Sequence, residues 1–326
     1  MKPLVVVGGA IHPDGIKQLE AEARVIVTDQ TTEEGMVAVA GEAEGILFRI
    51  TPDCTRSLMT ACSRLKVVGR HGVGLDTVDL KAATDLGIAV VHAPGSNSDS
   101  VAEHALMLIL ACAKQTLDVD RLTRRAEWKP PRPKANIELR GKTLGIVGVG
   151  NIGRRMARLG AALGMRVIGY DKYVPDDEVR ARGAEPKPDL YSVLSLADVV
   201  TCHTPHTPET HHMIDAGAIA QMKDGVIFVN TSRGKTQEEH ALFEALTRGK
   251  VRAAGLDVFE EEPVSADNPL LNLPNVVVSS HVAGVTAETV RAMAMQVTAE
   301  MARVLRGEKP HVLGNPEVWP KLANLR

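Results

Sequence analysis

Short apolar runs alternate with stretches of helical periodicity along most of this chain. The runs are rich in β-branched residues, which is typical of strands that are buried in a parallel sheet. Strands are therefore predicted at residues 4–7, 24–28, 45–48, 65–68 and 88–91, and again at 143–147, 166–170, 198–201, 226–230 and 251–257. This alternation predicts an α/β fold in which helices cover parallel sheets.

One predicted helix, at residues 101–110, is apolar on most of its faces. Ser100 and Glu103 fit a capping box at its start. A helix with so little polar surface is expected to be buried between two domains, and Glu103 and His104 are expected to be structural rather than catalytic. The proline-rich segment 129–134 that comes after it is expected to be an exposed loop.

Three glycines follow the strand at 143–147 with the spacing G-x-G-x-x-G. Gly148 permits a tight turn, Gly150 lets the backbone approach a pyrophosphate, and Gly153 lets a helix pack closely on the strand. The helix that starts there offers unpaired N–H groups to phosphates. The next strand ends at Asp171, about 20 residues further on, where a carboxylate can bind the adenosine ribose hydroxyls. Turns alone also collect glycine, but the order of strand, glycines, helix, strand and acid predicts a dinucleotide site.

Asp171 also indicates which dinucleotide is bound. Its negative charge repels the 2′-phosphate of NADP, so the expected cofactor is NAD. Lys172 beside it leaves room for some use of NADP.

Composition and charge exclude several classes of partner. The formal net charge of −2 and the pI of about 6.6 indicate neither nucleic acid nor a membrane surface. The longest apolar run, 105–113, is too short to span a bilayer, and the first apolar run is too short for a signal peptide. The cysteines show neither C-x-x-C nor zinc spacing, so we expect a reduced, cytoplasmic chain without a metal site; they are Cys54, Cys62, Cys112 and Cys202.

Three polar residues follow strands in the second half of the chain: Arg233, Glu262 and His281. Because ligands of parallel sheets bind beyond the carboxyl ends of the strands, these side chains are expected at a ligand site. A guanidinium can bind a carboxylate through two parallel hydrogen bonds, and an imidazole can donate a proton to a developing alkoxide. A carboxylate beside the imidazole would stabilise its charged form. Taken alone, Arg233 could equally be a surface cation, Glu262 part of a charged loop, and His281 a hydrogen-bonded histidine.

The first half of the chain carries two further loops at strand ends. Arg49 follows one strand, while Arg70 and His71 precede the loop Gly72-Val73-Gly74. The two glycines free backbone N–H groups to turn outward, which suits a carboxylate or phosphate oxygen. The alternatives are an ordinary strand-to-helix turn and a solvated arginine.

With these motifs the chain resembles the NAD-dependent D-2-hydroxyacid dehydrogenase family, which includes phosphoglycerate, glycerate and D-lactate dehydrogenases and hydroxypyruvate reductases. The resemblance covers nearly the whole chain, and its motifs lie at 72–76, 100–103, 148–153, 231–234, 257–263 and 281–284. It implies hydride transfer between NAD(H) and C2 of a small 2-hydroxy or 2-oxo acid. Arg233 would bind and orient the substrate, His281 would exchange the proton, and Glu262 would support His281.

The resemblance also implies the binding residues. The amides of Val73 and Gly74 would hold the substrate carboxylate. The cofactor would meet Gly148, Gly150, Asn151, Ile152, Gly153, Asp171, Thr204, Pro205, Thr231, Ser232, Arg233, Asp257, His281, Ala283 and Gly284. Arginines that match Arg49 and Arg70 meet the substrate phosphate in phosphoglycerate dehydrogenases, so a substrate with a second anionic group is expected. The alternative is that Arg70 pairs with Asp76 or Asp79.

The family fold implies two Rossmann-like, doubly wound parallel-sheet domains with the active site in the cleft. A discontinuous substrate domain, 1–99 plus 285–326, would accompany an NAD-binding domain at 100–284, through which a homodimer would form. After His281 the chain has room for one helix, at about 287–306, and a tail, so no regulatory domain is expected. His206 stands where the family generally has an aliphatic residue, and 235–237 and 279–280 also depart from its pattern.

Two other functions are compatible with these residues. The first is an NADPH-preferring glyoxylate or hydroxypyruvate reductase, which Asp171 disfavours. The second is a catalytically idle NAD-sensing interaction protein, and the intact set of Arg233, Glu262 and His281 speaks against it.

Overall fold

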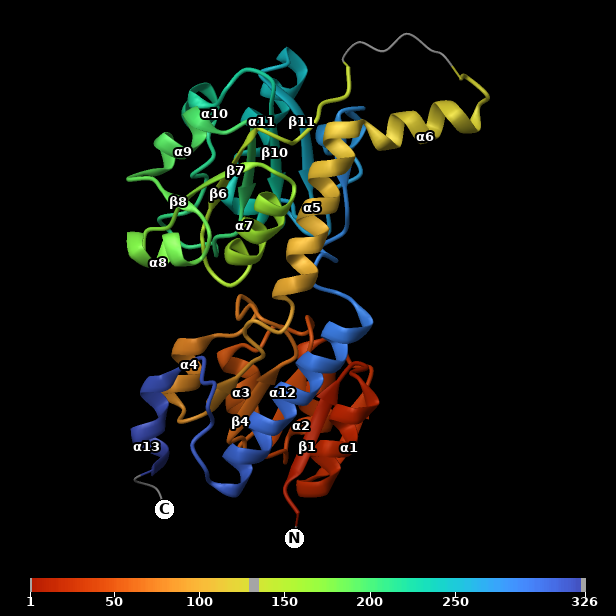
Figure 1. Cartoon of the computed structure of the whole chain (residues 1–326). Helices are drawn as coiled ribbons and strands as arrows, with labels where there is room; N and C mark the ends of the chain where they lie inside the picture. The colour runs from red at the N-terminus through yellow and green to blue at the C-terminus, as the bar shows by residue number, and fades with distance from the viewer. Residues whose placement is uncertain (1, 129–134, 324–326) are drawn as a thin grey trace. The chain divides into compact units, whose positions relative to one another are not determined.

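The protein is described by a computed structural model that covers residues 2–128 and 135–323, so segment 129–134 lies outside the described residues. The described residues form two compact α/β units (Figure 1). The first unit takes the residues up to Asn97 and from Val285 onward, and the second takes those from Ser98 to Gly284.

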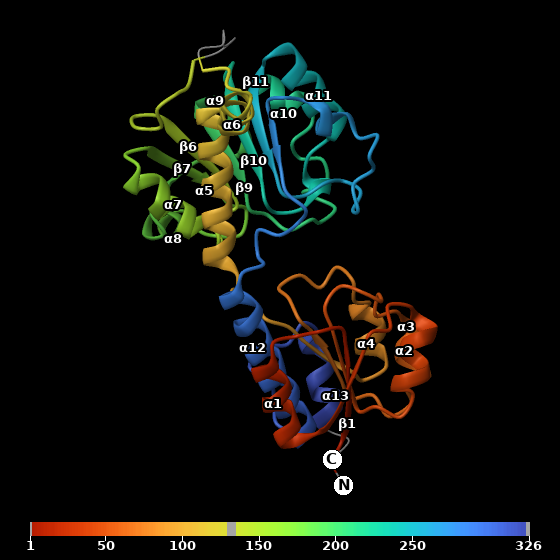
Figure 2. The same cartoon turned by 90° about the vertical axis from the view of Figure 1, so that its right-hand side faces the viewer.

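The first unit is built on a five-stranded parallel sheet of order β2-β1-β3-β4-β5. Its strands are β1 (Leu4–Gly8), β2 (Arg24–Thr28), β3 (Gly45–Phe48), β4 (Val67–Arg70) and β5 (Ala89–Val91). Its helices are α1 (Pro13–Glu22), α2 (Glu33–Ala40), α3 (Arg56–Ala61), α4 (Leu80–Asp85), α12 (Ala287–Arg306) and α13 (Trp319–Ala323). α1 and α12 share one apolar core with the sheet, and α2, α3 and α4 share the other (Figure 2). Residues from both ends of the chain therefore complete this unit.

The second unit is built on a seven-stranded parallel sheet of order β12-β11-β10-β9-β6-β7-β8. Its strands are β6 (Thr143–Val147), β7 (Arg166–Tyr170), β8 (Glu185–Pro186), β9 (Val199–Cys202), β10 (Val226–Asn230), β11 (Val251–Leu256) and β12 (Val276–Val278). Its helices are α5 (Ser98–Lys114), α6 (Thr116–Arg124), α7 (Gly153–Ala162), α8 (Asp176–Ala181), α9 (Leu190–Leu196), α10 (Ala216–Gln221) and α11 (Glu239–Arg248). α5, α7 and α8 pack on one face of the sheet and α9, α10 and α11 on the other. The predicted α/β fold with two parallel sheets is confirmed.

The order of the strands in this sheet changes direction between β6 and β9. β7 and β8 continue from β6 on one side, whereas β10, β11 and β12 continue from β9 on the other. Val147 at the end of β6 pairs with Cys202 at the end of β9. The loops that follow these two strands diverge, and ligands of doubly wound sheets bind in the crevice at such a point. The glycines therefore lie where this topology favours a ligand.

Helix α5 differs from the prediction for residues 101–110. It begins at Ser98, so Ser100 lies inside the helix and the predicted capping box is wrong. The Ser100 hydroxyl instead donates to the carbonyl oxygen of Ala283 at 2.6 Å. Leu108 and Ile109 are buried in the core of their own unit, and this packing accounts for the apolar faces of the helix.

Candidate active site

The glycine loop connects the end of β6 to the start of α7. Gly148 has a φ of +89°, and a Cβ there would stand 2.8 Å from the carbonyl oxygen of His203. A Cβ on Gly153 would stand 2.2 Å from the carbonyl oxygen of Gly148. A Cβ on Gly150 would meet nothing within 4 Å. Gly148 and Gly153 are thus required by the protein itself, whereas Gly150 borders open space where a phosphate could approach the backbone.

Asp171 lies directly beside this loop at the end of β7. Its Oδ2 accepts the N–H of Val149 at 2.8 Å, and its Oδ1 accepts the N–H groups of Tyr173 and Val174. These bonds fix a half-buried carboxylate next to the glycines. The Lys172 ammonium lies 2.8 Å from Glu209, which offsets its charge. Asp171 therefore places a carboxylate beside the glycine loop, which would repel a 2′-phosphate bound there.

Two buried threonine hydroxyls test whether these residues fit a dinucleotide. Thr204 Oγ1 and Thr231 Oγ1 have no hydrogen-bond partner among the residues that the structure describes. Thr204 also packs against the glycine loop, since its Cγ2 would lie 2.9 Å from a Cβ on Gly148. Buried hydroxyls nearly always have a partner, so a ligand with polar groups fits this edge of the sheet. Together with the open space at Gly150 and the carboxylate of Asp171, the residues present fit NAD.

His281 and Glu262 form a hydrogen-bonded pair beyond the ends of β11 and β12. His281 Nδ1 lies 2.6 Å from Glu262 Oε2, and Glu262 Oε1 accepts the N–H of Phe259 at 3.0 Å. The pairing occupies Nδ1, so Nε2 is the ring nitrogen left to meet a substrate. His281 is about half exposed, with 48% of its side chain accessible. This is the arrangement that an acid–base histidine needs.

The pKa of Glu262 reports what surrounds the pair. Burial raises it, but the hydrogen bonds from His281 and Phe259 and the positive charges of His281 and Arg233 lower it more, so that it lies below its usual range. The carboxylate is therefore ionised at neutral pH. The charge of Arg233 therefore acts on the pair. Arg233 is half-buried just after β10, and its Nη1 donates to the carbonyl oxygen of Ser232.

The loop that carries His281 is folded around Asp257, a role that the sequence did not indicate. The carbonyl oxygen of Asp257 accepts the N–H of His281 at 2.7 Å. Its buried carboxylate accepts the N–H groups of Val282 and Ala283, both at 2.9 Å, and the Ser279 hydroxyl at 2.6 Å. These bonds hold His281 at a φ of +55°, which is unfavourable for a residue with a side chain. Asp257 therefore positions His281, and its contact with the cofactor stays a prediction.

His104 extends this network from α5. Its Nε2 lies 2.8 Å from the Ser279 hydroxyl oxygen. Since that hydroxyl must donate to the Asp257 carboxylate, it accepts from His104, and Nε2 carries the proton. His104 was expected to be structural, and its contact supports the Asp257 loop rather than a ligand.

The other cofactor-binding residues predicted from the sequence lie in loops that follow strands of the seven-stranded sheet. Those after β6 and β9 are Asn151, Ile152 and Pro205, and those after β10 and β12 are Ser232, Ala283 and Gly284. Since these parallel strands end at one edge, the sheet gathers the loops there.

The residues predicted to bind substrate gather in the first unit at the ends of β3 and β4. These strands are neighbours, and Phe48 pairs with Arg70. Burial lowers the pKa of His71 to about 4, and the charges of Arg49 and Arg70 lower it further. Arg70 Nη1 donates to the carbonyl oxygen of His71 at 2.6 Å. Asp79 caps α4 by accepting the N–H of Ala82.

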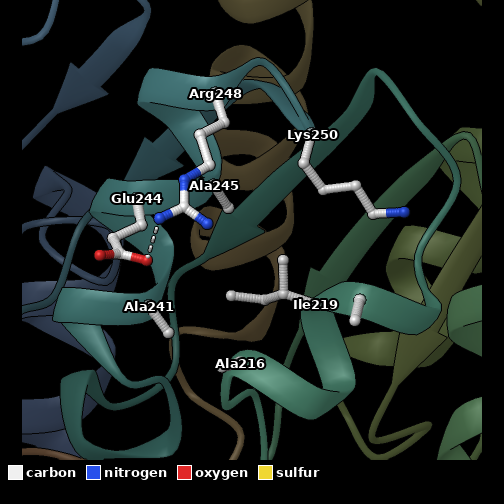
Figure 3. A pocket seen from close by; sticks show the side chains of 8 residues that line it. Ala216, Ile219, Ala241, Glu244, Ala245, Arg248 and Lys250 are labelled. Atoms are coloured by element: carbon white, nitrogen blue, oxygen red, sulfur yellow. Dashed lines mark ion pairs between the residues drawn. The ribbon is translucent and has the colours of Figure 1, made fainter.

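A separate pocket of about 350 Å³ lies between α10 and α11 (Figure 3). Ala216, Ile219, Ala241 and Ala245 give it an apolar floor, and Arg248 beside it pairs with Glu244 at 3.0 Å. Lys250, on its rim, precedes β11, whereas the site residues follow the strands. This pocket is therefore not part of the candidate active site.

Residues 2–128 and 135–323 contain no group of three or more histidine, cysteine or acidic side chains that could hold a metal ion. No helix within those ranges has the length and apolar character needed to cross a membrane. All four cysteines are buried and free.

Comparisons with known proteins point to one protein family. Residues 106–283 match the family described as "D-isomer specific 2-hydroxyacid dehydrogenase, NAD binding domain". The D-3-phosphoglycerate dehydrogenase of Methanocaldococcus jannaschii is 42% identical over 99% of this chain and 62% of its own length. The glyoxylate reductase of Korarchaeum cryptofilum is 36% identical over 98% of this chain and 97% of its own.

Solved structures show the same similarity. The D-lactate dehydrogenase of Aquifex aeolicus, complexed with NAD and lactic acid, is 27% identical with a TM-score of 0.83, covering 98% of both chains. The chain spans about 60% of the length of the curated phosphoglycerate dehydrogenases that it matches, from 57% to 62%. Because the family's sequence model covers more than half of the chain and includes the glycine loop, the NAD cofactor is assigned to the second unit. The chain belongs to the family of D-isomer specific 2-hydroxyacid dehydrogenases.

Proposed function

We propose that this protein is an oxidoreductase that transfers a hydride between NAD(H) and C2 of a small D-2-hydroxy or 2-oxo acid. The observation that carries the proposal is the 2.6 Å pairing of His281 with Glu262 at the carboxyl ends of the strands of the NAD-binding sheet, with Arg233 after the neighbouring strand β10. A catalytically idle NAD sensor would not need this pairing.

In this mechanism bound NADH supplies the hydride, and the side chains handle charge and protons. The Arg233 guanidinium binds the substrate and orients its C2 carbonyl. His281 Nε2 donates a proton to the oxygen as negative charge develops there, and it takes the proton back in the oxidative direction. Glu262 stabilises the imidazolium through Nδ1 and keeps the ring oriented.

We further propose that NAD is preferred over NADP. Asp171 places a fixed negative charge beside the glycine loop, and Glu209 pairs with Lys172, the nearest cation in sequence. An incoming 2′-phosphate would be repelled by Asp171. The NADPH-preferring reductase is for this reason the second candidate.

The preferred substrate is proposed to carry a second anionic group. Arg49 and Arg70 lie on neighbouring strands of the first unit and both influence His71. Each charge-assisted hydrogen bond to a phosphate, sulfonate or carboxylate could contribute about 1.5–3 kcal/mol. The similarity to proteins named D-3-phosphoglycerate dehydrogenase supports this class, while the similarity to glyoxylate reductases supports a smaller acid.

A cytoplasmic location and a homodimer complete the proposal. Four buried, free cysteines are consistent with a reducing compartment. The family resemblance is the basis for dimerisation through the NAD-binding domain, and sedimentation velocity would measure it.

The decisive experiment follows NADH absorbance at 340 nm with a panel of 2-oxo acids. The panel pairs monoanions, such as pyruvate and glyoxylate, with phosphorylated, sulfonated and dicarboxylic acids, each tested with NADH and NADPH. We expect oxidation of NADH in preference to NADPH, and a higher kcat/KM for dianions than for monoanions. An Arg70→Ala variant should lose the advantage of dianions and keep activity on monoanions. If no 2-oxo acid is reduced, the dehydrogenase proposal fails. If every dianion is a poorer substrate than pyruvate, the proposal of a second anionic group in the substrate is wrong.

A further inference from the structure

The loop Gly72-Val73-Gly74 in the first unit is held by two hydrogen bonds from the segment that follows β5. Ala93 N–H donates to the carbonyl oxygen of Gly72 at 2.9 Å. His92 Nδ1 lies 2.8 Å from the carbonyl oxygen of Val73. A carbonyl oxygen can only accept a hydrogen bond, so His92 Nδ1 must carry a proton.

These two bonds fix the direction of the next two amides in the loop. The peptide bonds of this loop are trans, because the cis bonds in the described residues are Thr51–Pro52 and Glu262–Pro263. In a trans peptide the carbonyl and the N–H of the following residue point in opposite directions. The N–H of Val73 therefore points away from Ala93, and the N–H of Gly74 points away from His92.

No backbone carbonyl within residues 2–128 and 135–323 accepts either of these N–H groups. Successive N–H groups that are turned outward form a small anion-binding surface. Arg70 adds positive charge beside it, since its Nη1 would lie 2.3 Å from a Cβ on Gly72. The loop thus has the donors and the charge that suit a carboxylate.

We propose that His92 is a positioning residue for the substrate carboxylate. It holds the Val73 carbonyl through Nδ1–H and thereby aims the Gly74 N–H at the carboxylate. The inference rests on the proposed function and deepens it, because it names a residue that acts on the substrate only through the Val73–Gly74 peptide.

The neutral imidazole is sufficient for this role. Burial lowers the pKa of His92, and although the hydrogen bond to Val73 raises it, the charge of Arg70 lowers it further, so that it lies below its ordinary value. At neutral pH the ring is thus uncharged with its proton on Nδ1. A side chain that offers one N–H at the same place should replace it.

Three substitutions of His92 test the proposal. His92→Asn keeps an N–H donor close to the position of Nδ1, His92→Asp offers only acceptors, and His92→Leu offers neither. We expect a KM for the 2-oxo acid that is about tenfold higher in the Asp and Leu variants, because the carboxylate loses an aligned N–H. Their kcat and their KM for NADH should stay within about twofold of wild type, and the Asn variant should behave as wild type throughout. Thermal melting checks that each variant is folded.

A binding measurement separates this proposal from the proposed function. Protein labelled with ¹⁵N-glycine is titrated with oxamate, an inert 2-oxo acid analogue, in the presence of NADH, and the Gly74 amide resonance is followed. We expect a shift in wild type and in His92→Asn, and an affinity about tenfold weaker in His92→Asp and His92→Leu. If wild type turns over no 2-oxo acid and this pattern still appears, the proposed function fails and the role of His92 stands. If wild type is active but all three variants bind oxamate equally well, or if kcat falls while KM is unchanged, the role of His92 is overturned.

Discussion

Replacing Glu262 with glutamine tests the proton-transfer assignment with little change of shape. The carboxylate uses both oxygens, one 2.6 Å from His281 Nδ1 and the other accepting the Phe259 N–H at 3.0 Å. Glutamine has one acceptor oxygen and one NH₂ group, so it cannot satisfy both partners. If the glutamine oxygen accepts from His281, its NH₂ group faces the N–H of Phe259. If the oxygen accepts from Phe259, the NH₂ group faces His281 Nδ1, and the His281 proton must move to Nε2. Both results disturb the orientation or the tautomer of the ring.

The size of the effect follows from the ionisation of Glu262. Burial raises its pKa, but the hydrogen bonds to His281 and Phe259 and the charges of His281 and Arg233 bring it below the ordinary range, so the bond that glutamine loses is charge-assisted. Such a bond contributes about 1.5–3 kcal/mol, which corresponds to a fall in kcat of roughly 10- to 100-fold. His281→Ala removes the proton donor itself and should cost about 10²–10⁴ in kcat with NADH binding retained.

The assay measures kcat and KM from pH 5 to 9 for wild type, both single variants and the double variant. If Glu262 acts through His281, the double variant should be no slower than His281→Ala alone. A Glu262→Gln enzyme within twofold of wild-type kcat across this range, or losses that multiply in the double variant, would refute the reasoning.

Stability supplies an independent check. Because the folded-state pKa of Glu262 is depressed, its contribution is present above the unfolded value of about 4.3 and is lost as the pH falls through the folded value. The Tm difference between wild type and Glu262→Gln should therefore shrink below about pH 4.

Three further substitutions test other parts of the site. Asp171→Ala should lower the ratio of kcat/KM for NADH over NADPH by about tenfold, because the ribose loses an acceptor and the 2′-phosphate loses a repelling charge. Ser279→Ala should lower kcat about fivefold with little change in the KM for NADH, because one hydrogen bond that supports Asp257 disappears. Gly150→Ala should leave Tm unchanged and weaken NADH binding by at least about tenfold in a fluorescence titration, whereas Gly153→Ala should lower Tm, because its Cβ would meet the Gly148 carbonyl oxygen at 2.2 Å.

The long strands of both sheets could be predicted because each is a local apolar run. Val226–Asn230, for example, is buried along its whole length and reads as a strand without knowledge of its neighbours. The strand Glu185–Pro186 could not be predicted, since two residues with a charge and a proline carry no apolar pattern. The start of α5 at Ser98 was missed for a related reason. The Ser100 hydroxyl satisfies a capping pattern in sequence, but its partner, the carbonyl oxygen of Ala283, is remote along the chain.

The candidate site also contains residues that could be predicted and residues that could not. The first are proposed to contact a ligand, and the second hold the loops that carry them. Arg233, Glu262 and His281 could be proposed from the sequence because each follows a strand and each has chemistry that the reaction needs. Nothing local marks Asp257 as the residue that folds the His281 loop, or His92 as the residue that holds Val73, because both act on backbone groups.

The two loops are nevertheless held in the same manner. Each has backbone groups fixed by a side chain from a distant part of the sequence, Asp257 for the N–H groups of residues 282 and 283 and His92 for the carbonyl of Val73. A hydrogen bond to a backbone group fixes the direction of that peptide whatever side chains the loop carries. The side chains of the loop could therefore change while the residue that binds its backbone stays the same. If Arg49 contacts the substrate as proposed, specificity could be altered there without disturbing the carboxylate loop, whereas Arg70 also donates to the carbonyl oxygen of His71 beside that loop. For the same reason, a substitution that removes the N–H donor at His92 or the carboxylate at Asp257 should impair every substrate alike.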